Sequence, residues 1–188
     1  MSTIALDLDR VLFDTNKYFI SLRERFKQHN LDFSEVVRKS EDCGRKDLTT
    51  MVNIVSEDIG KVNAEKLFFD DVHLFWEGGV AEIFDQLRTK FDKIFVITVG
   101  DGYQSKKISG LDIDGIFVVD CDHKKIEIAS ALHKKYPDLI FIDDKLSVVK
   151  EMDKLGIKTF QALWFLDEKY RQEKFDTHFN KAIDILEI

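Results

Sequence analysis

Short apolar segments alternate with longer amphipathic ones along the chain, and this alternation predicts a parallel sheet covered by helices. We expect strands at residues 3–9, 93–99, 115–119, 139–143 and 158–163. The first four are nearly all apolar, as strands buried on both faces must be. After the fifth strand, we expect a charged helix to seal one side of the sheet with Phe179, Ala182, Ile183 and Leu186. The predicted fold class is α/β.

The spacing between the first two expected strands is too long for a simple crossover. Roughly 80 residues separate them, whereas one helix would be enough. Residues 16–76 contain four helical patterns, with Ser34, Asp47 and Asn63 as candidate N-caps. We therefore expect residues 16–76 to form an inserted all-helical domain, with hinges near residues 14–16 and 77–79. Residues 1–15 and 77–188 would form the core.

Composition and charge narrow the possible partners and locations. The chain has 188 residues, of which 28 are basic and 35 acidic, for a net charge of −7. This balance argues against a nucleic-acid backbone or an anionic membrane as the main partner, since both require a basic face. The longest run without a charge is far shorter than the roughly 20 apolar residues of a membrane span. The N-terminus does not resemble an export signal, and we expect a cytoplasmic protein.

Acidic and hydroxyl side chains follow three of the expected strands. Asp7 and Asp9 end the first strand, Thr98 lies near the end of the second, and Asp143 and Asp144 end the fourth. The carboxyl ends of parallel strands open into one crevice, so we expect these groups to converge. Four facing carboxylates repel one another unless a cation neutralises them. Oxygen ligands without nearby His or Cys favour Mg²⁺.

Other acidic residues have simpler interpretations. Asp14 and Asp101, each taken alone, are interpreted as turn or helix-cap residues. Residues 112–115 imitate a metal-binding motif but precede a strand, so we interpret them as a turn. Residues 120–123 are interpreted as a solvated loop. Cys43 and Cys121 have no metal-ligand or disulfide spacing.

Four motifs in order resemble those of the haloacid dehalogenase-like (HAD) hydrolase superfamily, and the match extends over the whole chain. The first is the Ile-Ala-Leu-Asp-Leu-Asp-Arg-Val-Leu run at residues 4–12, and the second is the apolar strand that ends in Thr98. The fourth is the Phe-Ile-Asp-Asp run at residues 141–144. The third is a lysine before a helix, for which Lys124 and Lys125 both qualify. We favour Lys125, because apolar residues follow it four and seven positions on.

The resemblance implies a Rossmann-like core with a helical cap between the first two motifs. It also implies that Asp7 attacks phosphorus to form an aspartyl-phosphate and that Asp9 is the general acid and base. Mg²⁺ would bind the Asp7 carboxylate, the Asp9 backbone carbonyl, and the Asp143–Asp144 pair. Thr98 would hold phosphoryl oxygens, while Lys125 would offset charge near the nucleophile.

Two departures accompany this resemblance. Arg10 stands where the motif usually has glycine, and Val148 stands where an acid is common. Neither change removes a catalytic group. Haloacid dehalogenases lack an acid at the position of Asp9, which argues against dehalogenation.

The function that we expect is Mg²⁺-dependent hydrolysis of a small phosphorylated metabolite, such as a sugar phosphate, a nucleotide or a phosphoglycolate-like compound. A phosphomutase and a non-catalytic phosphate- or metal-binding module are the alternatives. A receiver-like signalling domain is a third, although it would lack the inserted helices.

One basic pair in the expected helical insertion is a candidate for substrate contact. Arg45 and Lys46 are adjacent cations in a turn of an otherwise acidic protein, and we expect them to reach the non-reacting end of an anionic substrate. The competing interpretation is that they are ordinary solvated residues of a turn.

Overall fold

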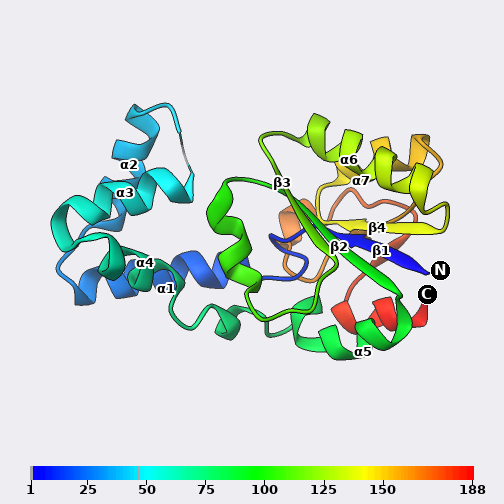
Figure 1. Ribbon diagram of the computed structural model, residues 1–188, viewed down its shortest axis with the longest axis horizontal. Coiled ribbons are helices and arrows are strands. Elements are labelled where there is room, and N and C mark those ends of the chain that lie inside the picture. Colours follow the sequence, from blue (N-terminus) through cyan, green and yellow to red (C-terminus); the bar gives the residue numbers. More distant parts are fainter. Residues whose placement is uncertain (1, 46) are drawn as a thin grey trace.

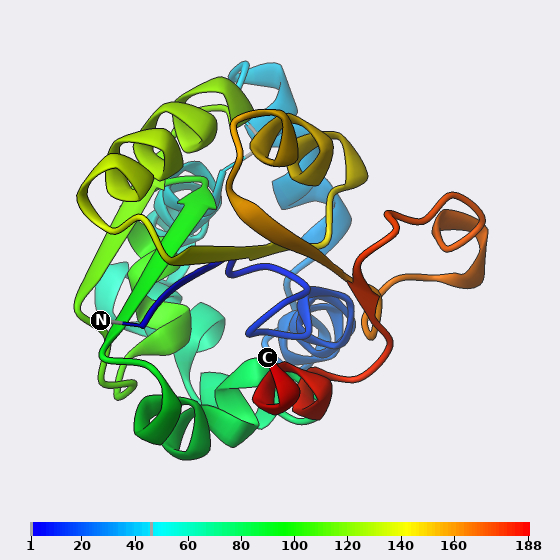
Figure 2. The same ribbon diagram turned by 90° about the vertical axis from the view of Figure 1, so that its right-hand side faces the viewer.

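The computed structural model describes residues 2–45 and 47–188. Its centre is a sheet of six parallel strands in the order β3-β2-β1-β4-β5-β6 (Figure 2). The predicted α/β fold class with a Rossmann-like parallel sheet is confirmed. The strands are β1 (Thr3–Leu6), β2 (Lys93–Val99), β3 (Gly115–Val119), β4 (Leu139–Asp143), β5 (Lys158–Ala162) and β6 (His178–Phe179).

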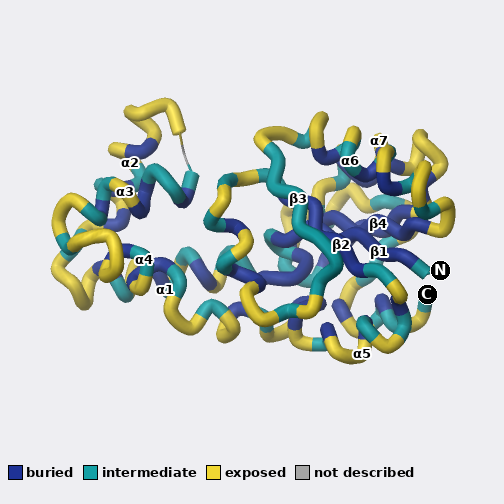
Figure 3. Tube along the Cα trace, in the orientation of Figure 1, coloured by how far each residue is buried: buried dark blue, intermediate teal, exposed yellow. Residues whose placement is uncertain are grey.

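Helices cover both faces of this sheet (Figures 1 and 2). The helices α6 (Asp122–Lys135) and α7 (Leu146–Lys154) pack on one face, and α5 (Phe84–Lys90) and the 3₁₀ helix η5 (Ala182–Glu187) lie on the other. Successive side chains of a strand point to opposite faces, so Ala5 packs in the cluster under α6 and α7 while its neighbours Ile4 and Leu6 pack in the other. The nearly unbroken apolar sequence of β1 follows from this two-sided burial (Figure 3).

Four α-helices lie past the carboxyl ends of the strands (Figure 1). They are α1 (Thr15–Gln28), α2 (Phe33–Asp42), α3 (Leu48–Ile59) and α4 (Lys61–Phe69), and the 3₁₀ turns η1 (Val72–Phe75) and η2 (Val80–Ile83) follow. One apolar cluster extends from the sheet into these helices. The rings of Phe13, Tyr18 and Phe75 lie within it, with centroids 5.2–5.7 Å apart. The division into a core and a cap remains a prediction.

The caps of these helices match the sequence only in part. Asp47 caps α3 as predicted, through its carboxylate and the N–H of Thr50. The cap of α2 is Asp32 rather than Ser34, because the Asp32 carboxylate accepts the Ser34 N–H and starts the helix earlier. Helix α4 begins after Gly60, so Asn63 lies inside it. Asp14 caps α1, in agreement with its interpretation as a cap.

The first strand is shorter than predicted, and a tight turn follows it. It stops at Leu6 rather than at Asp9. The carbonyl of Leu8 accepts the N–H groups of Val11, Leu12 and Phe13, at 3.4, 3.0 and 3.2 Å. The chain therefore turns back on itself immediately after Asp7.

The predicted C-terminal helix is wrong. Phe179 instead belongs to the edge strand β6, where its carbonyl accepts the Leu163 N–H at 3.0 Å. The 3₁₀ helix η5 follows, and its three-residue period buries Ala182 and Ile185 but leaves Ile183 exposed. The segment between β5 and β6 has the short 3₁₀ turn η4 (Glu168–Tyr170). Among the described residues, no helix has the length and apolar character needed to cross a membrane.

Candidate active site

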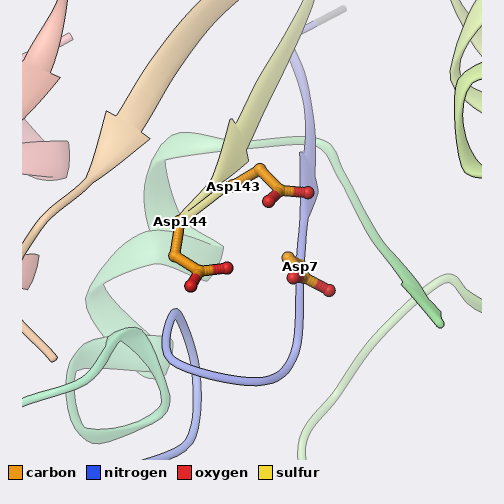
Figure 4. Close-up of side chains that lie close together, drawn as sticks. All are labelled: Asp7, Asp143 and Asp144. Atoms are coloured by element: carbon orange, nitrogen blue, oxygen red, sulfur yellow. The ribbon is translucent and has the colours of Figure 1, made fainter. Parts of the chain in front are cut away.

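Three carboxylates meet where β1 and β4 end (Figure 4). Leu6 is in register with Ile142, and the Asp7 N–H donates to the Ile142 carbonyl at 2.9 Å. This pairing places Asp7 beside Asp143, with Asp144 next along the chain. Each of the three acids offers an oxygen within 4.8 Å of the others. The strand register thus brings together acids that are more than 130 residues apart in the sequence.

One buried lysine lies between two of these acids. The Lys125 ammonium is 2.9 Å from Asp7 Oδ1 and 2.8 Å from Asp143 Oδ2, and its side chain is only 4% exposed. Burial lowers the pKa of Lys125, but the two carboxylates outweigh burial and raise it above its usual range. Lys124, the other candidate from the sequence, is exposed and pairs with Asp120 at 2.7 Å. Lys125 shares the inward face of α6 with Ala129 and Leu132, and it is the lysine next to Asp7.

The acidic cluster is short of positive charge. Burial raises the pKa of Asp7 well above its usual value despite Lys125, and Asp143 and Asp144 raise it further. Burial and Asp143 likewise raise the pKa of Asp144 to about 6. A divalent cation would relieve this repulsion, and the buried Asp7 and Asp143 together with the half-buried Asp144 supply the oxygen ligands that Mg²⁺ prefers. The donor set therefore fits Mg²⁺.

The expectation that four carboxylates face one another is wrong for Asp9, which is not in the cluster of Asp7, Asp143 and Asp144 and has hydrogen-bond partners of its own. Its Oδ1 accepts from Lys107 and from the Thr15 hydroxyl, both at 2.6 Å, and its Oδ2 accepts from Gln104 at 2.9 Å. Burial raises the pKa of Asp9, but these three donors, Lys107 foremost, bring it below its usual value. The arrangement favours the ionised carboxylate, which is the form that accepts a proton.

The other residues singled out in the sequence occupy different surroundings. Thr98 is buried near the end of β2. Arg10 has a φ of +64°, the region that favours glycine, and its guanidinium is 3.5 Å from Asp144. Arg45 is exposed and its N–H donates to the Ser40 carbonyl, while Lys46 lies outside the described residues. A substrate contact from this pair remains a prediction.

The sequence does not predict the partners of Asp9. Gln104 and Lys107 belong to the 3₁₀ helix η3 (Gly102–Ile108), which follows the strand that ends beyond Thr98. Their spacing of three is the period of such a helix and places both on one side of it. That spacing is the only local signal, and a seven-residue polar segment does not reveal which side faces an acid.

Known proteins match this chain by structure rather than by sequence. No family model matches the sequence, and no curated protein sequence does. A protein from Burkholderia xenovorans LB400, assigned as a haloacid dehalogenase-like hydrolase, superimposes with a TM-score of 0.68 over 99% of this chain and 97% of its own, at 15% identity. The chain has the HAD hydrolase fold.

Two further solved structures also have the HAD fold. The L-2-haloacid dehalogenase of Xanthobacter autotrophicus matches with a TM-score of 0.60 at 11% identity, over 100% of this chain and 97% of its own. YfnB of Bacillus subtilis, assigned as a HAD hydrolase and crystallised with magnesium, matches with a TM-score of 0.56 at 16% identity, over 100% and 99%. At such low identities the likeness establishes the fold, and the reaction must be argued from the residues of the site.

Proposed function

We propose that this protein is a Mg²⁺-dependent phosphomonoester hydrolase that acts on a small phosphorylated metabolite. The observation that carries this proposal is the pair of differently placed acids that follow β1. Asp7 lies with Lys125 in the carboxylate cluster, whereas Asp9 lies nearby in a separate network of hydrogen bonds. This difference supports a nucleophilic role for Asp7 and a proton-transfer role for Asp9.

The reaction would proceed in two steps on these side chains. In the first, the Asp9 carboxylate takes up a proton from solvent, the Asp7 carboxylate bonds to phosphorus, the ester P–O bond breaks, and Asp9 passes its proton to the leaving oxygen. In the second, water attacks the aspartyl-phosphate, Asp9 accepts the proton of that water, and the P–O bond to Asp7 breaks. The aspartate is regenerated and phosphate leaves.

The remaining groups of the site would offset the negative charge of the substrate and of the carboxylates. Asp7, Asp143 and Asp144, together with the Asp9 carbonyl, would hold Mg²⁺, which when bound stabilises negative charge on the phosphoryl oxygens. Lys125 keeps a positive charge beside Asp7, so a phosphate dianion meets less repulsion. The Thr98 hydroxyl would hold a phosphoryl oxygen. A cytoplasmic location and a small anionic substrate remain part of the proposal.

An aryl phosphate assay tests this function. With Mg²⁺, the purified protein should release phosphate, and a chelator should stop the release. The Asp7→Asn variant should lose turnover entirely, whereas Asp9→Asn should bind Mg²⁺ in a calorimeter and still lose most turnover. Turnover that persists in the Asp7→Asn variant would overturn the mechanism. Release of halide from 2-haloacids, with no phosphate release from any ester of a metabolite panel, would replace the phosphatase with a dehalogenase.

A further inference from the structure

The 3₁₀ helix η3 contacts both the helices past the sheet and the Asp9 carboxylate. It begins at Asp101, whose Oδ1 accepts the Tyr103 N–H at 2.8 Å. The other oxygen of the same carboxylate, Oδ2, accepts the N–H of Thr49 in the first turn of α3, also at 2.8 Å. One side chain therefore starts η3 and holds the N-terminus of α3.

One side of η3 binds helix α4. Glu65 of α4 accepts from the Tyr103 hydroxyl at 2.8 Å and from the Lys106 ammonium at 2.6 Å. The ring of Phe69, one turn further along α4, stacks on Tyr103 with centroids 5.1 Å apart and planes 10° from parallel. The Lys106 ammonium lies 5.5 Å from the centroid of the Phe69 ring. These polar and aromatic contacts join η3 to α4.

The other side of η3 holds Asp9. Gln104 Nε2 donates to Asp9 and to the Val99 carbonyl, at 2.9 and 3.0 Å, and the Lys107 ammonium donates to Asp9 at 2.6 Å. A side chain at Gly100 would place Cβ 2.5 Å from Gln104 Nε2, so the glycine makes room for this contact. Lys107 is 3% exposed and lies over the Phe13 and Tyr18 rings.

The two sides of η3 belong to one short helical segment of seven residues. A 3₁₀ helix has three residues per turn, so Gln104 and Lys107 share one side, while Tyr103 and Lys106 share the side that precedes it. The indole N–H of Trp76 donates to the Lys107 carbonyl at 2.9 Å and holds the backbone of η3 from a third direction. A shift of α4 that pulls on Tyr103 and Lys106 is therefore transmitted to the groups that hold Asp9.

We propose that η3 couples the placement of helices α3 and α4 to the placement of the Asp9 carboxylate. Gln104 and Lys107 act as positioning residues, since they act on the reaction through Asp9. Glu65 is the link on the helical side. The activity part of this inference rests on the proposed phosphatase function, whereas the structural coupling does not.

The test compares two glutamates of the same helical group. Glu65→Ala removes the link, and Glu57→Ala removes an exposed glutamate of α3 that forms no ion pair with a described residue. With an aryl phosphate, Glu65→Ala should lower kcat about tenfold with little change in KM, because a small displacement of a catalytic group is costly. Glu57→Ala should have no such effect. The exchanged pair Glu65→Lys with Lys106→Glu should recover most of the loss.

Hydrogen exchange supplies a readout that needs no turnover. Glu65→Ala should speed exchange of the Thr49 amide and of the Trp76 indole N–H, which donates to the backbone carbonyl of Lys107, and Glu57→Ala should speed neither. Unchanged exchange at Trp76 would overturn the coupling whatever the activity. A loss of kcat that is equal in the two variants would also overturn it. If the wild-type protein hydrolyses no ester but Trp76 responds as expected, the coupling stands and the phosphatase proposal alone fails.

Discussion

Replacing Lys125 with methionine tests the charge balance of the acidic cluster. Methionine fills a similar volume but leaves Asp7 and Asp143 without the ammonium that lies 2.8–2.9 Å from them. Removing one partner of a buried ion pair costs about 3–5 kcal/mol, because the other partner stays buried and uncompensated. The urea dependence of unfolding is about 2 kcal/mol per molar for a protein of this size. The midpoint of urea unfolding should therefore fall by about 2 M.

The assay is urea unfolding at neutral pH with a chelator present, and Lys124→Met is the matched control. Lys124 is the adjacent lysine but pairs with Asp120 in solvent, so its replacement should leave the midpoint almost unchanged. Added Mg²⁺ should return part of the stability of Lys125→Met, because it supplies positive charge to the same carboxylates. Equal midpoints for the two variants would refute the role of Lys125 as the counter-charge of this cluster.

The pH dependence of this loss has a defined sign. Without Lys125, the pKa of Asp7, already raised by burial, should rise further above its unfolded value. A folded acid with a raised pKa destabilises the protein when it ionises. The difference between Lys125→Met and the wild type should therefore grow as the pH rises from acid to neutral and shrink as the acid takes up a proton. A difference that is constant over this range would contradict the argument.

Three further predictions concern other parts of the fold. Burial raises the pKa of Asp114, but Arg88 and Lys93 hold it below its usual value. Asp114→Asn should therefore lower the melting temperature at neutral pH. The difference in melting temperature between this variant and the wild type should vanish as acid protonates Asp114 in the wild type. A Cβ at Gly79 would lie 2.7 Å from the Leu12 carbonyl oxygen, so Gly79→Ala should lower the free energy of unfolding in urea by about 1–3 kcal/mol. A Cβ at Gly102 meets no atom within 4 Å, so Gly102→Ala should lower it much less. At Arg10, where φ is +64°, Arg10→Gly should be more stable than Arg10→Ala by about 1 kcal/mol. Calorimetry should also show tighter Mg²⁺ binding in both variants than in the wild type, because a cation beside Asp144 is removed. Stability equal in the two Arg10 variants would argue against backbone strain there.

The sequence by itself determined five of the six strands and the positions of the acids that follow them. Nearly unbroken apolar segments identified β1, β2, β3 and β4, because a strand covered on both faces needs apolar side chains on both. Asp7, which follows β1, and Asp143, which ends β4, could be recognised in the sequence as acidic residues at the ends of apolar segments. Parallel strands open their carboxyl ends to one crevice, so the meeting of Asp7 with Asp143 could be predicted without coordinates.

Tertiary structure alone decided how the remaining segments fold. The C-terminal segment has the apolar spacing of a helix, but Phe179 pairs with β5 at the edge of the sheet and ends that pattern. A free sheet edge offers backbone hydrogen bonds that local helix preference cannot outweigh. Only a short 3₁₀ helix follows β6, and it leaves Ile183 exposed to solvent.

The partners of Asp9 were likewise decided by the fold. Gln104 and Lys107 lie in a polar segment with no periodic apolar pattern, and nothing local distinguishes Lys107, which is buried, from Lys106, which contacts α4. Only the close approach of η3 to the turn after β1 determines which side chain meets the acid. A sequence shows which residues can carry charge. Burial strengthens the interactions of a charge, and which charges are buried depends on contacts between distant segments.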